Sequence, residues 1–197
     1  DLEEYYVIKP TDSARLLKLG VIYGANASGK TNFLEALEAM RDLVINPNNR
    51  KTETLPVHPF LFDAEAKGSN TIFSIEFYQS SVKYRYTIEL NKSCVDKEEL
   101  IFYSPNKPTV FSRTTDKEKQ ISHIKFGSKI NLPKEQVTAL AVNTLWNTTV
   151  LGGFLKTNID VPQLKEVDRW FQDVLSPMIT PKTDLFGFVS SKIEAEE

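Results

Sequence analysis

The stretch that decides the fold is LGVIYGANASGKTNFLEALEAM, residues 19–40. Its centre matches the pattern Gly-x-x-x-x-Gly-Lys-Ser/Thr at Gly24, Gly29, Lys30 and Thr31. The apolar run at residues 19–23 ends directly in a glycine, which predicts a short buried strand before the loop. This pattern binds phosphate when the loop joins a strand to a helix, so the sequence predicts a phosphate loop.

The segment after the loop is predicted to be an amphipathic helix over residues 31–44. Phe33, Leu37, Met40 and Val44 recur at steps of three and four residues, with charged residues between them. The helix is expected to end near the Asn-Pro pair at residues 46–47.

The residue types of the loop fit the chemistry of a nucleoside triphosphate. Glycine permits backbone angles and close approaches that a Cβ would block. The amides of residues 25–31 are expected to surround a phosphate at the positive end of the helix. Lys30, which is also the expected catalytic residue, would place its charge on the phosphate oxygens, and the Thr31 hydroxyl would ligate Mg²⁺. The predicted nucleotide-binding residues are Gly24, Ala25, Asn26, Ala27, Ser28, Gly29, Lys30, Thr31 and Asn32.

The rest of the chain changes character twice. Residues 73–77 and 82–90 alternate apolar and polar side chains, which predicts a hairpin, and shorter strands follow at 100–103, 110–113 and 121–126. No helical pattern separates these strands, so they should pair antiparallel. Helices are expected at about 164–175 and from residue 183 or 184 onward. The prediction is a P-loop α/β core over 1–70, an antiparallel β region of the same lobe over 71–126, and a helical region over 127–197.

Residues 22–37 resemble the head-domain loop of the ABC-type ATPases of the SMC, RecF and OLD group, which reads Gly-x-Asn-x-Ser-Gly-Lys-Ser/Thr-Asn. The likeness is closest to the AAA-type bacterial ATPases of that group, which include abortive-infection and other anti-phage proteins. In that group the first asparagine braces the loop and the second begins the helix. The resemblance therefore implies these roles for Asn26 and Asn32, and implies lobe I of an ABC-type head as the fold.

Two parts of such a head have no counterpart in the sequence. The signature Leu-Ser-x-Gly and a Walker B strand ending in Asp-Glu both belong to lobe II, which is expected beyond residue 197. The Q-loop glutamine is also hard to place, because residues 140–147 contain none. Gln136, Asn143 and Asn147 are left as alternatives for that position.

The resemblance implies an ATP-driven switch in which two heads of the full-length protein form a homodimer around ATP and Mg²⁺. The full-length protein would then be an ATPase, whereas lobe I alone would bind Mg-ATP without hydrolysing it efficiently. The alternatives are a GTPase and a nucleotide or small-molecule kinase. The Asn-Lys-Ser-Cys sequence at 91–94 lacks the aspartate of a guanine-binding motif, and a kinase would alternate strands with helices.

The composition of the chain limits which binding partners are expected. A net charge of −2 gives no general attraction for nucleic acid, and no apolar run approaches the ~20 residues of a membrane helix. A single cysteine, Cys94, suits a cytoplasmic location. Lys125, Lys129 and Lys134 with Phe126 form a loose basic and aromatic mixture for which a solvated face is the simpler interpretation.

Two further groups are given structural roles, and a third is left open. His58 and His123 lie far apart in the sequence and lack the spacing of metal ligands. The acidic residues Asp96, Glu98 and Glu99 are expected in a solvated turn and not as nuclease carboxylates, because no further acids join them in a matching motif. The pair at residues 5–6, Tyr-Tyr, either packs beside a strand or stacks on a nucleotide base.

Overall fold

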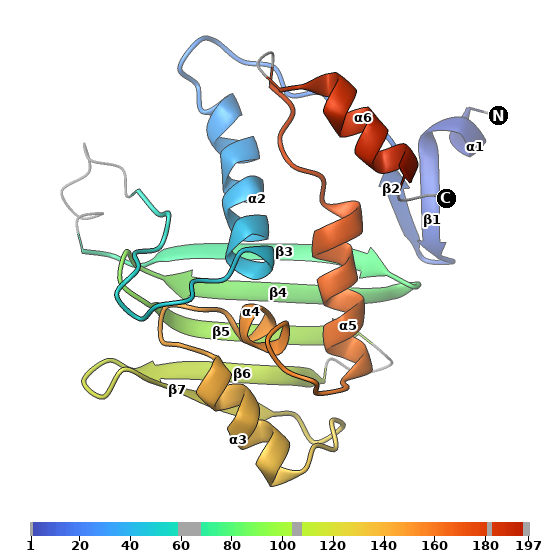
Figure 1. The fold of residues 1–197 in the computed structure, drawn as a ribbon. Coiled ribbons are helices and arrows are strands. Elements are labelled where there is room, and N and C mark those ends of the chain that lie inside the picture. Colours follow the sequence, from blue (N-terminus) through green and yellow to red (C-terminus); the bar gives the residue numbers. More distant parts are fainter. Residues whose placement is uncertain (1, 59–67, 104–107, 181–182, 195–197) are drawn as a thin grey trace.

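The computed structural model describes residues 2–58, 68–103, 108–180 and 183–194. A short helix α1 (Glu3–Tyr6) leads into the two-stranded hairpin of β1 (Val7–Thr11) and β2 (Ala14–Leu17). After helix α2 (Lys30–Ile45) come β3 (Thr71–Gln79), β4 (Val82–Leu90), β5 (Val95–Tyr103), β6 (Thr109–Asp116) and β7 (Ile121–Phe126). The chain continues with α3 (Lys134–Asn143), α4 (Val150–Phe154), α5 (Pro162–Arg169), a π-helical turn (Trp170–Val174) and α6 (Leu185–Glu194) (Figure 1).

The central feature is a five-stranded sheet in the order β3-β4-β5-β6-β7. Every neighbouring pair is antiparallel, which confirms the predicted pairing. Alternation decides which face is dry, because successive side chains point to opposite sides of a strand. On β4, Tyr84, Tyr86, Ile88 and Leu90 are buried, whereas the residues between them lie on the outer face.

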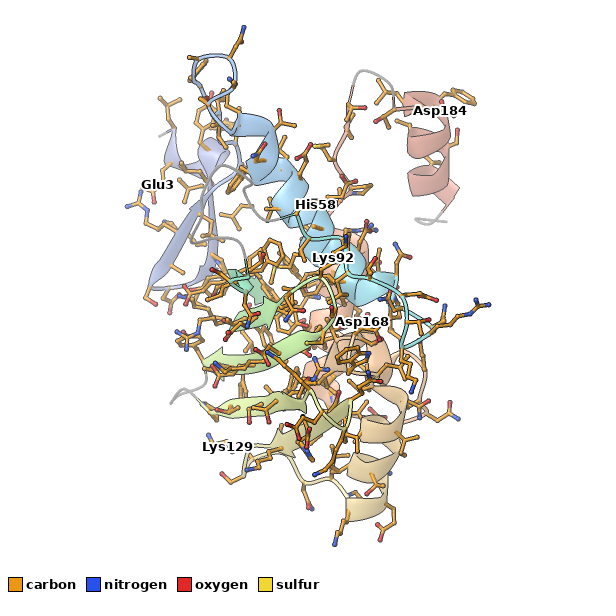
Figure 2. The ribbon with its side chains drawn as sticks, turned by 90° about the vertical axis from the view of Figure 1, so that its left-hand side faces the viewer. Glu3, His58, Lys92, Lys129, Asp168 and Asp184 are labelled. Atoms are coloured by element: carbon orange, nitrogen blue, oxygen red, sulfur yellow. The ribbon has the colours of Figure 1, made fainter. Side chains whose placement is uncertain are left out.

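Helices α2, α3, α4 and α5 lie on one face of this sheet (Figures 1 and 2). From α2 the core receives Met40, Leu43 and Val44, so the helix predicted for this segment is confirmed although Phe33 at its start is exposed. The π-helical turn that follows α5 packs beside α2, and its Trp170 stacks on Phe77 of β3 with ring centroids 4.0 Å apart. Burying each such large side chain contributes about 1.5–3 kcal/mol. Among the described residues no helix combines the length and apolar character that crossing a membrane requires.

The strand predicted at residues 19–23 is wrong. This segment has no regular secondary structure, and the side chains of Leu19, Val21, Ile22 and Tyr23 are exposed. The reason is that no strand pairs with it in the described chain, since the strands of the larger sheet all come from residues 71–126 and those of the hairpin from residues 7–17. An isolated apolar segment cannot pair its backbone groups or bury its side chains alone.

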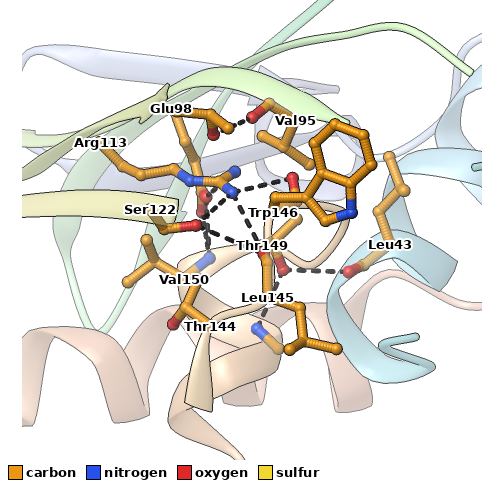
Figure 3. A network of polar contacts seen from close by, with 12 residues as sticks. Leu43, Val95, Glu98, Arg113, Ser122, Thr144, Leu145, Trp146, Thr149 and Val150 are labelled. Atoms are coloured by element: carbon orange, nitrogen blue, oxygen red, sulfur yellow. Dashed lines mark hydrogen bonds and ion pairs between the residues drawn. The ribbon is translucent and has the colours of Figure 1, made fainter. Parts of the chain in front are cut away.

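The acidic group expected in a solvated turn also needs correction, because Glu98 is buried at 2% exposure on the dry face of β5. Its carboxylate accepts hydrogen bonds from the Tyr86 hydroxyl (2.6 Å) and the Val150 backbone N–H (2.8 Å). Arg113 lies directly opposite on β6, with Nη1 3.8 Å from Oε2 of Glu98, which makes an ion pair without a hydrogen bond (Figure 3). Burial raises the pKa of Glu98 despite these partners, and burial lowers the pKa of Arg113.

The buried pair fixes the chain segment that precedes α4. Arg113 Nη2 donates to the Ser122 hydroxyl and to the carbonyls of Leu145 and Trp146, at 2.8, 3.2 and 3.0 Å. Thr149 caps α4 by accepting from the Gly152 N–H, and its hydroxyl also donates to the Leu43 carbonyl near the end of α2 (3.0 Å). The network therefore joins the sheet, α4 and the C-terminal end of α2 (Figure 3).

We predict that Arg113→Met lowers the free energy of unfolding by about 3–5 kcal/mol at pH 8, because it leaves the Glu98 carboxylate buried without its countercharge. The loss should be smaller at pH 5. The ordinary pKa of a glutamate is 4.5, and the pKa of Glu98 in the folded protein is higher. Between these two pH values, folded Glu98 holds a proton that the unfolded chain has released. The contribution of Glu98 to the free energy of unfolding therefore falls as pH rises. Without Arg113 the pKa of folded Glu98 is higher still, so the pH range over which stability falls extends further upward.

Urea unfolding at both pH values measures this effect. Arg85→Met on the outer face of β4 is the matched control, with an expected change within about 0.5 kcal/mol. Equal losses for Arg113→Met at pH 5 and pH 8 would show that Glu98 does not carry the effect.

Candidate phosphate-binding site

The predicted phosphate loop lies at the N-terminal end of α2, at the far end of that helix from the sheet (Figure 1). Residues 24–29 are exposed, and Lys30 is the first residue of the helix. A hollow of about 290 Å³ is lined by residues 27–32. The C-terminal half of the helix is held in the core by Met40, Leu43 and Val44, so the loop is carried on the free end of an anchored helix.

The backbone of the loop is turned so that its amides are available. Ala27 and Gly29 adopt left-handed conformations, with φ of 61° and 86°. No side chain caps the helix at Gly29. Among the described residues, the N–H groups of Ala27, Gly29, Lys30, Thr31 and Asn32 donate to no other backbone group. Unpaired amides at a helix N-terminus form an anion-binding concavity.

Lys30 is directed back onto the beginning of the loop. Its ammonium donates to the carbonyls of Gly24 (2.9 Å) and Ala25 (2.6 Å). These contacts are exposed to water, which competes for the ammonium and weakens them. A phosphate in the hollow would compete with these two carbonyls for the lysine.

The other predicted side chains lie around the same hollow. Thr31 and Asn32 are exposed on the first turn of α2 and line it. Asn26 is exposed in the loop, and in the described part of the chain no hydrogen bond of its side chain is found. The structure thus places these residues together, while the bracing role of Asn26 stays a prediction.

The three candidates for the Q-loop position lie elsewhere. Asn147 is buried at the opposite end of α2, where its amide donates to the carbonyls of Arg50 and Glu53. A 16-residue helix spans about 24 Å, so Asn147 cannot contact a phosphate at Lys30. Gln136 and Asn143 belong to α3, which lies beside β7 and away from the loop (Figure 1).

We predict that Gly29→Ala lowers the free energy of unfolding by about 1–2 kcal/mol, because a side chain is strained at a left-handed φ of 86°. Gly20→Ala is the control, since no atom lies within 4 Å of its added Cβ and its φ is not left-handed. Chemical denaturation of both variants measures the difference. Equal stability of the two would contradict the left-handed conformation at Gly29.

Comparison with known families agrees with this geometry. The family model described as "AAA domain, putative AbiEii toxin, Type IV TA system" matches residues 19–139, more than half of the chain. No curated protein and no solved structure gives a match. The matched span begins at the apolar run before the loop and extends through the whole five-stranded sheet into α3. The chain belongs to this family of AAA domains, which is a family of the P-loop ATPase type.

Proposed function

We propose that this chain binds ATP with Mg²⁺ at the phosphate loop. The observation that carries the proposal is the group of unpaired amides of Ala27 and residues 29–32 around one hollow, next to the ammonium of Lys30. A triphosphate supplies oxygen atoms that such donors bind, and the AAA family supports a nucleotide as the ligand.

Each part of the site has a distinct task in this proposal. The amides of Ala27 and residues 29–32 would hold phosphate oxygens, and Lys30 would turn from the Gly24 and Ala25 carbonyls to neutralise their charge. The exposed Thr31 hydroxyl would contribute one ligand to Mg²⁺, which keeps its other positions for phosphate and water. When bound, Mg²⁺ screens the negative charge of the phosphates.

We further propose that the chain is lobe I of an ABC-type head of the SMC, RecF and OLD kind. The order of a phosphate loop, an antiparallel sheet and then helices supports this interpretation. So do the exposed apolar side chains at residues 19–23 and at Ile8 and Leu17 of the preceding hairpin. Large apolar side chains exposed in such number at one end of the chain are typical of a contact region. A second lobe that carries the Walker B strand would cover it.

In this proposal two full-length heads close on ATP and open after hydrolysis, in DNA-related work or in defence against phage. Lobe I supplies Lys30 and Thr31 to one side of the nucleotide. The opposite side would come from the signature segment of the partner head. The P-loop half alone should therefore bind the nucleotide and turn it over poorly.

We predict that Lys30→Ala weakens Mg-ATP binding at least 100-fold in isothermal titration, because the variant loses the one side-chain cation of the loop. Lys92→Ala is the matched control, since Lys92 is an exposed lysine on the β4–β5 turn, away from the loop (Figure 2). Competition against a labelled ATP analogue should favour ATP over GTP. Unchanged affinity of Lys30→Ala would overturn the site, and preference for GTP would overturn the nucleotide.

A second prediction separates binding from turnover. Phosphate release from Mg-ATP by this 197-residue chain should equal that of its Lys30→Ala variant, although only the unsubstituted chain binds the nucleotide. The reason is that the groups activating water lie outside lobe I in this proposal. A steady-state assay at saturating ATP measures the rate. Turnover that depends on Lys30 in the monomeric chain would contradict the lobe I assignment and leave the binding site intact.

A further inference from the structure

A groove runs along the open edge of the five-stranded sheet. It has a volume of about 550 Å³ and is lined by β7, which ends the strand order, and by α3. The ribbon in Figure 1 shows these two elements next to each other. Its strand side is formed by residues 120–125, and its helix side by Val137, Thr138, Ala141 and Val142. The size is that of a ligand site, and six residues of strand span about 20 Å.

The edge of β7 carries backbone groups that can pair with another strand. Gly127 N–H donates to the Val110 carbonyl. Backbone hydrogen bonds to one neighbouring strand recur at every second residue of an antiparallel strand. Counting back from Gly127, the backbone N–H and C=O groups of Ser122, Ile124 and Phe126 are therefore directed away from β6. Within the described chain no loop or helix backbone pairs with these three residues. An edge of this kind is a template for strand addition.

The two faces of β7 require different side chains of an added strand. On the dry face, Ile124 lies beside Val137 and Ala141 of α3 along the groove. On the wet face, His123 and Lys125 are exposed, and neither has an acidic partner among the described residues. Not one aspartate or glutamate belongs to the described lining of the groove. Opposite charges stabilise a cross-strand pair, so acidic side chains fit the wet face.

We propose that this groove binds an extended segment of a partner protein as a sixth strand, with apolar and acidic residues in alternation. The backbone of the segment would pair with Ser122, Ile124 and Phe126. Its apolar side chains would enter the groove over α3, and its carboxylates would face Lys125 and His123.

A second copy of this chain fits the edge less well. Two β7 strands could pair antiparallel through their free backbone groups in three registers near the middle of the strand. In these registers Lys125 lies opposite His123, Lys125 or Ile121 of the copy. None of these registers gives the lysine a carboxylate. Like charges in opposed positions destabilise a sheet, so the charge pattern favours the acidic partner.

The test uses a fluorescein-labelled peptide of seven residues, alternating valine and glutamate, with blocked ends. Fluorescence anisotropy should show saturable binding, at least tenfold tighter than for the same peptide with lysine in place of glutamate. Lys125→Glu should weaken binding of the glutamate peptide at least tenfold, whereas Lys92→Glu, away from the groove, should leave it unchanged. A peptide N-methylated at alternate residues should not bind, because it lacks the N–H groups that pair with β7.

Several outcomes would overturn the proposal. Equal binding of the N-methylated peptide would show that no strand is added, and an effect of Lys92→Glu equal to that of Lys125→Glu would show non-specific attraction. Saturable binding of a single-stranded oligonucleotide in place of the peptide would assign the face to nucleic acid. A dimer in sedimentation that Lys125→Glu dissociates would assign the edge to a second copy. Mutation of Lys30 should not affect peptide binding, so this test is independent of the nucleotide site.

Discussion

The anchoring of α2 is the constraint on which the rest of the site depends. Met40, Leu43 and Val44 fix the C-terminal half of this helix in the core, whereas the amides of its first turn pair with no backbone group of the described chain. A rigid helix transmits the position of its anchored end to the other, so the sheet sets the orientation of the phosphate loop. The hydrogen bond from Thr149 to the Leu43 carbonyl ties the same end of α2 to the buried network.

That network is costly in free energy, and its contacts compensate only part of the cost. Glu98 and Arg113 are both removed from water, and their ion pair and hydrogen bonds together do not fully offset this, as the direction of both pKa changes indicates. Tyr86, the Val150 N–H and the carbonyls of residues 145 and 146 supply the additional hydrogen bonds. The pair thereby specifies one arrangement of α4 on the sheet, beside the anchored end of α2.

Local patterns predicted the local elements well. Alternation located β3 and β4, and helical spacing located α2, because both patterns reflect which face each element buries. The short strand predicted at 121–126 matches β7. The errors arise where burial depends on distant partners. Residues 19–23 are apolar but have no neighbouring strand in the described chain, and Glu98 is charged but lies opposite Arg113 on the next strand. For Glu98 the sequence carried one signal of burial: the alternation of β6 places Arg113 on the inward face, where it can supply a countercharge. The groove beside β7 depends on strand order, which single-strand patterns do not contain.

We propose that the molecule joins a nucleotide site at one end of α2 to a sheet whose far edge accepts a partner strand. The central claim is that the amides at the start of α2 bind phosphate. Amide chemical shifts of the ¹⁵N-labelled chain, recorded as Mg-ATP is added, test this most directly. We expect the largest changes at Ala27 and residues 29–32, and we expect them to saturate together. Changes confined to other parts of the chain, or no change at these amides under saturating Mg-ATP, would contradict the claim.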